Sequence, residues 1–160
     1  MTRRTPKPEP LPIEHWVGYR FGLLAARLGS MMQPVTQGRH KLSTSSWRVL
    51  AVIARFEPCS AAELSSHSRL DPSKVSRAIE VLVDRKFIKR NKDPDDLRRA
   101  VLTLTPLGRR TYEDCAEQVR RNEAFYTATL TPQERKAMWA AVDKIERQIA
   151  DLPLAPPIDE

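Results

Sequence analysis

Cysteine and glycine are scarce in this sequence, and no long hydrophobic run occurs in it. Two of the 160 residues are cysteine and five are glycine, a composition that excludes a collagen-like repeat and a disulfide-stapled mini-protein. No segment approaches the roughly 18 uninterrupted apolar residues that a membrane-spanning helix needs. The first ten residues also lack the apolar stretch of an export signal. We therefore expect a folded cytoplasmic protein with no membrane partner.

Motifs that carry enzyme chemistry are missing as well. The sequence contains no glycine-rich phosphate loop, no pair of catalytic carboxylates and no nucleophile elbow. Cys59 and Cys115 lack the spacing of a metal site or a redox pair, and three scattered histidines do not make a metal site. We therefore predict that the protein is not an enzyme and that it needs neither a metal nor another cofactor.

The charge of the chain is divided unevenly along its length. Residues 1–59 carry 9 basic and 3 acidic side chains, residues 60–110 carry 12 and 7, and residues 111–160 carry 6 and 10. An excess of basic residues indicates a polyanionic partner, and here it falls in the first two thirds of a chain that has the length of one domain. The acidic last third predicts that the two ends of the chain can dock together.

The N-terminal part of the chain predicts a flexible arm followed by a long helix. Residues 1–12 alternate proline with polar residues, which is typical of an extended, flexible arm. Apolar residues then recur at helical spacing and predict a helix over residues 13–33 that ends at Pro34. The opposite face of this helix carries small residues, which allow close backbone approach, so both faces are suited to packing. On a terminal helix this pattern indicates a homodimer.

The middle of the chain predicts three short helices and a hairpin. Capping signals place the first helix from a cap at Ser43 or Thr44 through Glu57. They place the second at the capping box Ser60–Glu63 and the third from Asp71–Pro72 to about residue 86. Two β-prone segments, residues 87–91 and 100–104, flank a polar tip. A short helix, a tight turn, a second helix and a hairpin follow the order of a winged helix-turn-helix, whose second helix reads the major groove of DNA.

Two more helices complete the predicted fold. Thr105–Pro106 starts the first, and the capping box Thr131–Glu134 starts the second. One side of the second helix carries a regular apolar stripe, which consists of Met138, Ala141, Val142, Ile145, Ile149 and Leu152. The expected fold class is mainly α with a small β-hairpin wing. The winged helix-turn-helix spans about 43–105, the dimerisation helices span about 13–33 and 106–152, and residues 153–160 form a flexible tail.

Three strings within this middle segment carry a family pattern. They are Asp71-Pro-Ser-Lys-Val-Ser-Arg77, the segment Leu82–Arg90, and Asp93-Pro-Asp-Asp-Leu-Arg98 followed by Val101–Gly108. In these strings and in the order of its helices, the chain closely resembles the MarR family of bacterial transcription regulators. The resemblance implies a single domain over 13–152 and a homodimer that binds an inverted-repeat operator in double-stranded DNA. It also implies a repressor that leaves the DNA when a small molecule binds to it. Such a protein would be located in the cytoplasm, and on the nucleoid when it is bound to DNA.

By this resemblance, four residues of the second helix contact DNA: Ser73, Lys74, Ser76 and Arg77. Arg77 suits a contact with guanine through two hydrogen bonds. The alternative is that Arg77 forms an ion pair with Glu80 or Asp84 on the helix surface. Ser60, at the start of the preceding helix, is expected to contact a phosphate through the helix N-terminus.

The hairpin tip carries the motif that is most specific to the family. Asp96 and Arg98 are two residues apart, so the carboxylate can hold the guanidinium in an extended pose that enters the minor groove. Arg99 is expected to contact a phosphate or to face solvent. The family often has arginine where this chain has Leu97. Without the surrounding helices, the same charged run would be interpreted as a solvated turn.

Two arginines in the first predicted helix, Arg20 and Arg27, fall within its apolar stripe. A guanidinium there needs an anionic partner, because an unpaired buried charge is costly. Either the acidic C-terminal helices supply it, or Arg20 binds an anionic ligand beside the aromatic rings of Trp16, Tyr19 and Trp47. The resemblance implies a small aromatic effector, such as an aromatic acid or its thioester.

A second class of function stays open at this point. A winged helix can also serve as a protein-interaction module, which would bind an acidic protein through its basic face and respond to no ligand. The basic hairpin tip and the serine, lysine and arginine residues of the second helix favour DNA over this alternative. Competition by duplex DNA against a bound protein would separate the two.

Overall fold

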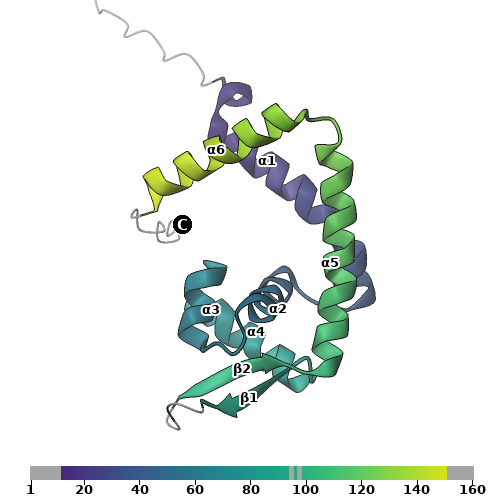
Figure 1. Cartoon of the computed structure of the whole chain (residues 1–160), viewed down its shortest axis with the longest axis vertical. Coiled ribbons are helices and arrows are strands. Elements are labelled where there is room, and N and C mark those ends of the chain that lie inside the picture. Colours follow the sequence, from purple (N-terminus) through teal and green to yellow (C-terminus); the bar gives the residue numbers. More distant parts are fainter. Residues whose placement is uncertain (1–11, 94–95, 97–98, 151–160) are drawn as a thin grey trace, which may run out of the picture. The chain divides into compact units, whose positions relative to one another are not determined.

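The computed structural model describes residues 12–93, 96 and 99–150 of the chain. Its helices and strands confirm the predicted fold class, mainly α with one β-hairpin (Figure 1). The elements are η1 (Ile13–His15), α1 (Val17–Ser30), η2 (Pro34–Arg39), α2 (Thr44–Phe56), α3 (Ala61–Ser68), α4 (Pro72–Asp84), β1 (Ile88–Lys92), β2 (Ala100–Leu104), α5 (Pro106–Thr127) and α6 (Pro132–Ile149). The chain divides into two compact units, Met1–Val119 and Arg120–Glu160, and α5 continues from the first into the second.

The N-terminal helix differs from the prediction at both ends. A short 3₁₀ turn, η1, comes first, and the extended backbone of Trp16 (ψ 116°) separates it from α1. The amide of Trp16 donates to the carbonyl of Ile13 over 3.1 Å, which closes the 3₁₀ turn instead of extending α1. Pro34 does not end the helical path as predicted. It is the first residue of η2, a π-helical turn, and proline is tolerated at a first helical position because its missing N–H is not required there.

The three helices of the middle segment start where their capping residues predicted. Ser43 Oγ accepts a hydrogen bond from a first-turn amide of α2 (3.0 Å), and Asp71 Oδ1 accepts one from a first-turn amide of α4 (2.8 Å). Ser60 and Glu63 form the expected reciprocal capping box of α3. Each cap satisfies amides that the helix itself leaves unpaired, and it thereby determines the residue at which the helix begins.

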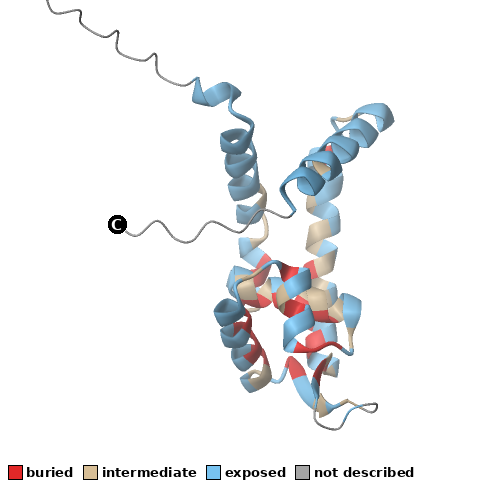
Figure 2. Cartoon of the chain, turned by 90° about the vertical axis from the view of Figure 1, so that its left-hand side faces the viewer, coloured by how far each residue is buried: buried red, intermediate tan, exposed pale blue. Residues whose placement is uncertain are grey.

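The hydrophobic core lies between α2, α3, α4 and the hairpin (Figure 2). α4 contributes the four residues of its predicted apolar stripe, Val75, Ala78, Ile79 and Leu82, each no more than 3% exposed. Because a helix repeats every 3.6 residues, burying this stripe turns the opposite side of α4 outward. The other elements supply the remaining core residues, which are Leu42, Val49, Leu50, Ile53, Cys59, Leu64, Phe87, Ile88, Leu102 and Leu104.

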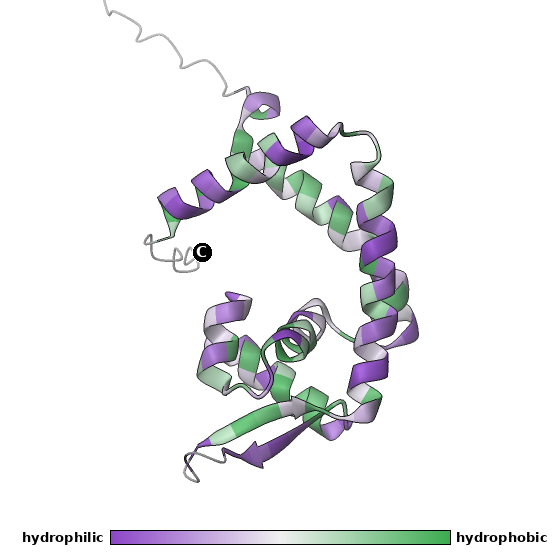
Figure 3. Ribbon diagram, in the orientation of Figure 1, coloured by the Kyte–Doolittle hydropathy of each residue, from purple (hydrophilic) through white to green (hydrophobic). Residues whose placement is uncertain are grey.

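The wing is an antiparallel pair of strands in which Arg90 lies opposite Leu102. β1 starts one residue later than predicted, because the amide of Phe87 still bonds to the carbonyl of Leu82 at the end of α4 (2.9 Å). β2 is largely apolar and β1 largely polar (Figure 3). β2 therefore supplies Leu102 and Leu104 to the core and presents its other edge to the loop between α2 and α3.

Two helices, α1 and α6, contain no buried residue. The apolar stripe predicted for α6 is present on the helix, but Met138, Ile145 and Ile149 are 37%, 39% and 50% exposed. Leu152, the last member of that stripe, lies outside the described residues. On α1, large apolar side chains such as Phe21 are exposed as well. None of the helices in the described part of the chain combines the length and hydropathy of a membrane span.

Gly108→Ala should destabilise the protein. A Cβ at Gly108 would lie 1.8 Å from the carbonyl oxygen of Phe87, a backbone atom that cannot move aside without disturbing the hairpin. We expect the free energy of unfolding in urea to fall by about 1–3 kcal/mol. Gly38→Ala is the matched control, because its Cβ would make only an ordinary contact of 3.7 Å. Equal effects of the two substitutions would contradict the close approach at Gly108.

Candidate nucleic-acid interface

The outer face of α4 carries the four residues expected to read DNA. Ser73, Lys74, Ser76 and Arg77 are all exposed, between and opposite the members of the buried stripe. Asp71 Oδ1 accepts hydrogen bonds from the hydroxyl and the amide of Ser73, so this serine is part of the helix cap. The same hydrogen bonds lower the pKa of Asp71. The side chains of Lys74, Ser76 and Arg77 are exposed on the same face.

Within the described ranges, Arg77 has no ion-pair partner. The surface ion pair with Glu80 or Asp84, the alternative for this residue, is not formed. Arg77 and Lys74 instead border a recess of about 210 Å³ whose other side is lined by three serines at the start of α2. Ala78 and Val81 complete its lining. The two cations beside hydroxyl groups give the recess a positive charge that suits a contact with a backbone phosphate.

The loop between α2 and α3 fastens the wing to the helix-turn-helix along the free edge of β2. Near α5, Glu57 Oε2 accepts a hydrogen bond from the amide of Leu104 (2.7 Å). In the middle, Cys59 and Leu102 exchange two backbone hydrogen bonds of 2.8 and 3.3 Å. Toward the hairpin tip, the guanidinium of Arg99 reaches the capping box of α3. The wing is thus held at three points on one side.

Ser60 and Arg99 were both expected to contact phosphate, and the structure gives both another partner. The Arg99 guanidinium donates to Ser60 Oγ (3.1 Å) and forms an ion pair with Glu63 (2.7 Å) and a longer one with Asp93 (3.9 Å). Ser60 is buried, and its amide and hydroxyl both donate to Glu63. The carboxylate three residues along the chain already satisfies the helix start, which leaves Ser60 no free group for a phosphate.

The carboxylate of Glu63 is the negative centre of this cluster. Its Oε2 accepts hydrogen bonds from the amide and the hydroxyl of Ser60, both over 2.7 Å, and it pairs with Arg99. These contacts lower the pKa of Glu63 from 4.5 to about 2, so the side chain is ionised at neutral pH. A permanent negative charge therefore stands at the N-terminus of α3, where it has the favourable sign for the helix dipole.

The wing-tip motif is described only in part. Arg98, which was expected to enter the minor groove, lies outside the described residues, and so does Leu97. Asp96 is described, and its backbone carbonyl accepts a hydrogen bond from the amide of Arg99 (2.9 Å). The contact between Asp96 and Arg98 stays a prediction.

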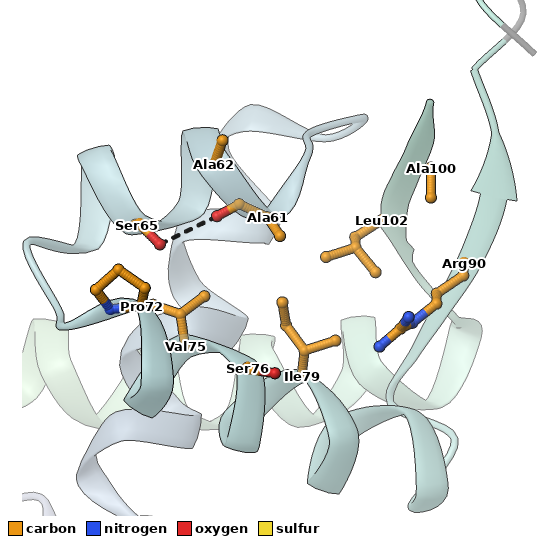
Figure 4. Close-up of a pocket in the computed structure, with 10 residues that line it drawn as sticks. All are labelled: Ala61, Ala62, Ser65, Pro72, Val75, Ser76, Ile79, Arg90, Ala100 and Leu102. Atoms are coloured by element: carbon orange, nitrogen blue, oxygen red, sulfur yellow. Dashed lines mark hydrogen bonds between the residues drawn. The ribbon is translucent and has the colours of Figure 1, made fainter. Parts of the chain in front are cut away.

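A larger groove, of about 570 Å³, lies between α3, α4 and the wing (Figure 4). Its lining is mostly apolar and includes Val75, Ile79 and Leu102, while the guanidinium of Arg90 projects toward it from β1. The reasoning from sequence missed Arg90. The signal that could have found it is the two-residue period of a strand, which places Arg90 on the same face of β1 as the buried Ile88.

The four residues expected to bind a ligand have different surroundings. Trp47 packs on the hydrophobic core, where its ring stacks on that of Tyr112 with centroids 6.0 Å apart. Trp16, Tyr19 and Arg20 are exposed, and Arg20 donates to a backbone carbonyl of the preceding turn over 3.3 Å. Trp47 therefore packs against the core in this structure, and Trp16, Tyr19 and Arg20 stay the exposed candidates for a ligand contact.

A helix-turn-helix followed by a two-stranded wing, with an exposed basic face on its second helix, defines a winged helix-turn-helix protein. The model of the MarR family matches residues 40–99 of the chain, which span the helix-turn-helix and most of the wing. The match agrees with the family that the wing and helix motifs indicated.

Individual relatives agree with this assignment. The HTH-type transcriptional regulator BilQ of Clostridium symbiosum is 30% identical over 93 residues, which cover 58% of this chain and 65% of BilQ. The match thus spans less than two thirds of that relative. Among solved structures, BpsR of Bordetella bronchiseptica is 25% identical with a TM-score of 0.72, over 91% of this chain and all of that one. CouR of Rhodococcus jostii RHA1 has the same fold, with 18% identity and a TM-score of 0.76 over 92% of this chain and all of that one.

Both cysteine thiols should be unreactive in the folded protein. Burial raises the pKa of Cys59 and of Cys115 to about 11, so at pH 8 roughly one thiol in a thousand is in the reactive thiolate form. We expect no rapid reaction of the native protein with Ellman's reagent, and reaction of both thiols once guanidinium chloride has unfolded the chain, which serves as the control. Fast labelling of the native protein would contradict the burial and reopen a redox role.

Proposed function

We propose that the protein is a dimeric transcription regulator that binds a specific sequence in double-stranded DNA through α4 and the wing. The observation that carries this proposal is the outer face of α4, where Lys74, Ser76 and Arg77 stand exposed in a winged helix that matches the MarR family model. A second helix so placed enters the major groove, and the wing lies over the neighbouring backbone and minor groove. The similarity to the regulator BilQ supports the same function.

The chemistry of each side chain on α4 suggests its role. Arg77 can donate two hydrogen bonds to O6 and N7 of a guanine, the commonest specific contact in the major groove. Lys74, beside the charged recess, suits a backbone phosphate, which sets the register of the protein without reading the sequence. The hydroxyls of Ser73 and Ser76 suit single contacts with a base or a phosphate. At the wing tip, Arg98 is proposed to enter the minor groove.

A homodimer follows from the apolar side chains that the described chain leaves exposed. α1 and α6 carry most of them, including Val17, Leu24, Trp139 and Ile149, which are between 50% and 55% exposed. Monomeric soluble proteins rarely expose large apolar patches. We propose that a second copy covers these helices. Two-fold symmetry then presents two α4 helices to the two halves of an inverted repeat.

We infer that a small aromatic anion controls the binding of DNA, as an effector that releases a repressor. The DNA binding of BpsR is regulated by 6-hydroxynicotinic acid, and CouR has been solved with p-coumaroyl-CoA bound. Two candidate counter-ions are Arg20, on α1 close to Trp16, and Arg90, whose guanidinium projects toward the groove between α4 and the wing (Figure 4). Either can hold a carboxylate while the aromatic ring rests on apolar side chains.

Arg77→Ala should weaken the binding of a duplex that the wild type selects from a random pool. We expect a loss of about 1–3 kcal/mol and a relaxed base preference at one position of each half-site, because a two-donor contact with a base is removed. Fluorescence anisotropy on the selected duplex and its single-base variants measures both. Arg147→Ala removes an exposed arginine outside the winged helix and should have little effect. Lost affinity with unchanged preference would assign Arg77 to a phosphate.

Sedimentation equilibrium should show a particle of twice the chain mass of 18.3 kDa. Leu24→Glu places a charge on the exposed apolar face of α1 and should shift the protein toward the monomer, because burying an unpaired carboxylate is costly. Val81→Glu is the matched control, since Val81 is an exposed apolar residue of α4. A wild-type protein that sediments as a monomer would rule out the dimer.

Replacing the ligand's counter-ion should make DNA release less sensitive to the effector. The probes are 6-hydroxynicotinate and p-coumaroyl-CoA, and the variants are Arg20→Ala and Arg90→Ala. The variant that removes the counter-ion should need roughly ten- to hundredfold more effector for release, the equivalent of about 1.5–3 kcal/mol. The other variant is its matched control. If both variants release DNA at the wild-type concentration, neither arginine holds the effector.

A further inference from the structure

The end of the wing nearest the tip is held by side chains, whereas the rest of its edge is held through backbone groups. Leu104 and Leu102 are fastened through their amides. Beyond them the last fastening is Arg99, whose guanidinium spans from the hairpin to Glu63 (2.7 Å) and Ser60 (3.1 Å) on α3. A two-stranded hairpin is marginally stable by itself, so the direction of its outer half depends on that last contact.

We propose that Arg99 is a positioning residue: it clamps the outer half of the wing to the capping box of α3 and thereby sets where the wing meets DNA, without contacting a phosphate itself. The inference rests on the proposed function, since it assigns a role within the same DNA-binding surface. It differs from the role expected from the sequence, in which Arg99 contacts phosphate or solvent.

The charge around Arg99 argues against a phosphate contact. Glu63 lies 2.7 Å and Asp93 3.9 Å from the guanidinium, so two carboxylates surround one positive charge. These carboxylates offset the positive charge of Arg99, which weakens its attraction for a polyanion. Lys74 and Arg77 have no such carboxylate partner among the described ion pairs, so their charges are more available to a phosphate.

The capping box explains why Glu63 can hold a wing. Its carboxylate already accepts hydrogen bonds from the amide and the hydroxyl of Ser60, both over 2.7 Å. These bonds hold the carboxylate in position independently of Arg99. An anchored carboxylate costs less side-chain entropy to pair than a mobile one. The pKa of Glu63, lowered to about 2, keeps the anchor charged at any pH at which the protein would meet DNA.

Two substitutions distinguish the clamp from a phosphate contact by the sign of their effects. Arg99→Met removes the guanidinium, and Glu63→Gln removes the negative charge but keeps an oxygen that can accept the Ser60 amide. If Arg99 is a clamp, both variants bind the selected duplex roughly two- to fivefold more weakly, and the double variant binds no more weakly than Arg99→Met. If Arg99 contacts a phosphate, Glu63→Gln binds DNA more tightly, because a repulsive charge has been removed.

The salt dependence of binding supplies an independent readout. A lost phosphate contact reduces the slope of log K against log[KCl] by about 0.9, whereas a loosened clamp leaves it unchanged. Anisotropy titrations at several KCl concentrations, on the wild type, Arg99→Met, Glu63→Gln and the double variant, measure both quantities. A reduced slope for Arg99→Met, or a gain in affinity for Glu63→Gln, would overturn the proposal.

A measurement without DNA keeps the clamp testable if the proposed function itself fails. Solvent exchange can be followed by NMR at two amides: that of Asp93, which donates to Arg99 within the hairpin, and that of Leu102, which donates to Cys59 in the loop between α2 and α3. Arg99→Met and Glu63→Gln should both accelerate this exchange, while Lys92→Met, which removes a cation of β1, should not. Unchanged exchange in Arg99→Met would refute the clamp. If exchange is accelerated in this variant but the wild type binds no duplex, only the DNA-binding function is refuted.

Discussion

The burial of one side of α4 determines which of its side chains are exposed to a partner. Four apolar residues at helical spacing pack against α2, α3 and the hairpin, and Val75 and Leu82 among them are essentially inaccessible. The intervening polar residues then face outward as a geometrical consequence. A register shift of one residue would place Arg77 in the core and a valine outside, at the cost of burying an unpaired charge. The core thus specifies the interface.

Cations of the winged helix have different surroundings that composition does not distinguish. Arg99 and Arg109 pair with Glu63 and Glu57 and connect the wing and α5 to α3 and the end of α2. Among the described ion pairs, Lys74 and Arg77 have no such partner. A paired cation attracts a polyanion less strongly, so the net charge of the segment overstates how many cations a partner can use.

Local signals in the sequence predicted most of the fold. The caps at Ser43, Ser60 and Asp71 and the stripe of α4 depend on residues within a turn or two of one another, and the structure confirms them. The break at Trp16 was missed because its backbone is extended within an otherwise helical pattern.

Such local signals do not predict contacts between residues that are far apart in the sequence. Ser60 and Arg99 are 39 positions apart, and nothing in either motif indicates that they meet. Trp47 was grouped with the first helix by its aromatic character, whereas its ring stacks on Tyr112 in α5. The hairpin and the capping box were each predicted, but their joining depends on the packing that brings β2 alongside the loop.

The position of the core in the chain has a consequence for synthesis on the ribosome. Every residue of the core cluster lies between Leu42 and Leu104, so this core needs no residue that follows β2. The winged helix can therefore fold as soon as β2 has emerged. α1 is synthesised earlier but contributes no residue to that core. In the proposed dimer, its apolar side chains would therefore be covered only after the winged helix has folded, when a second copy binds.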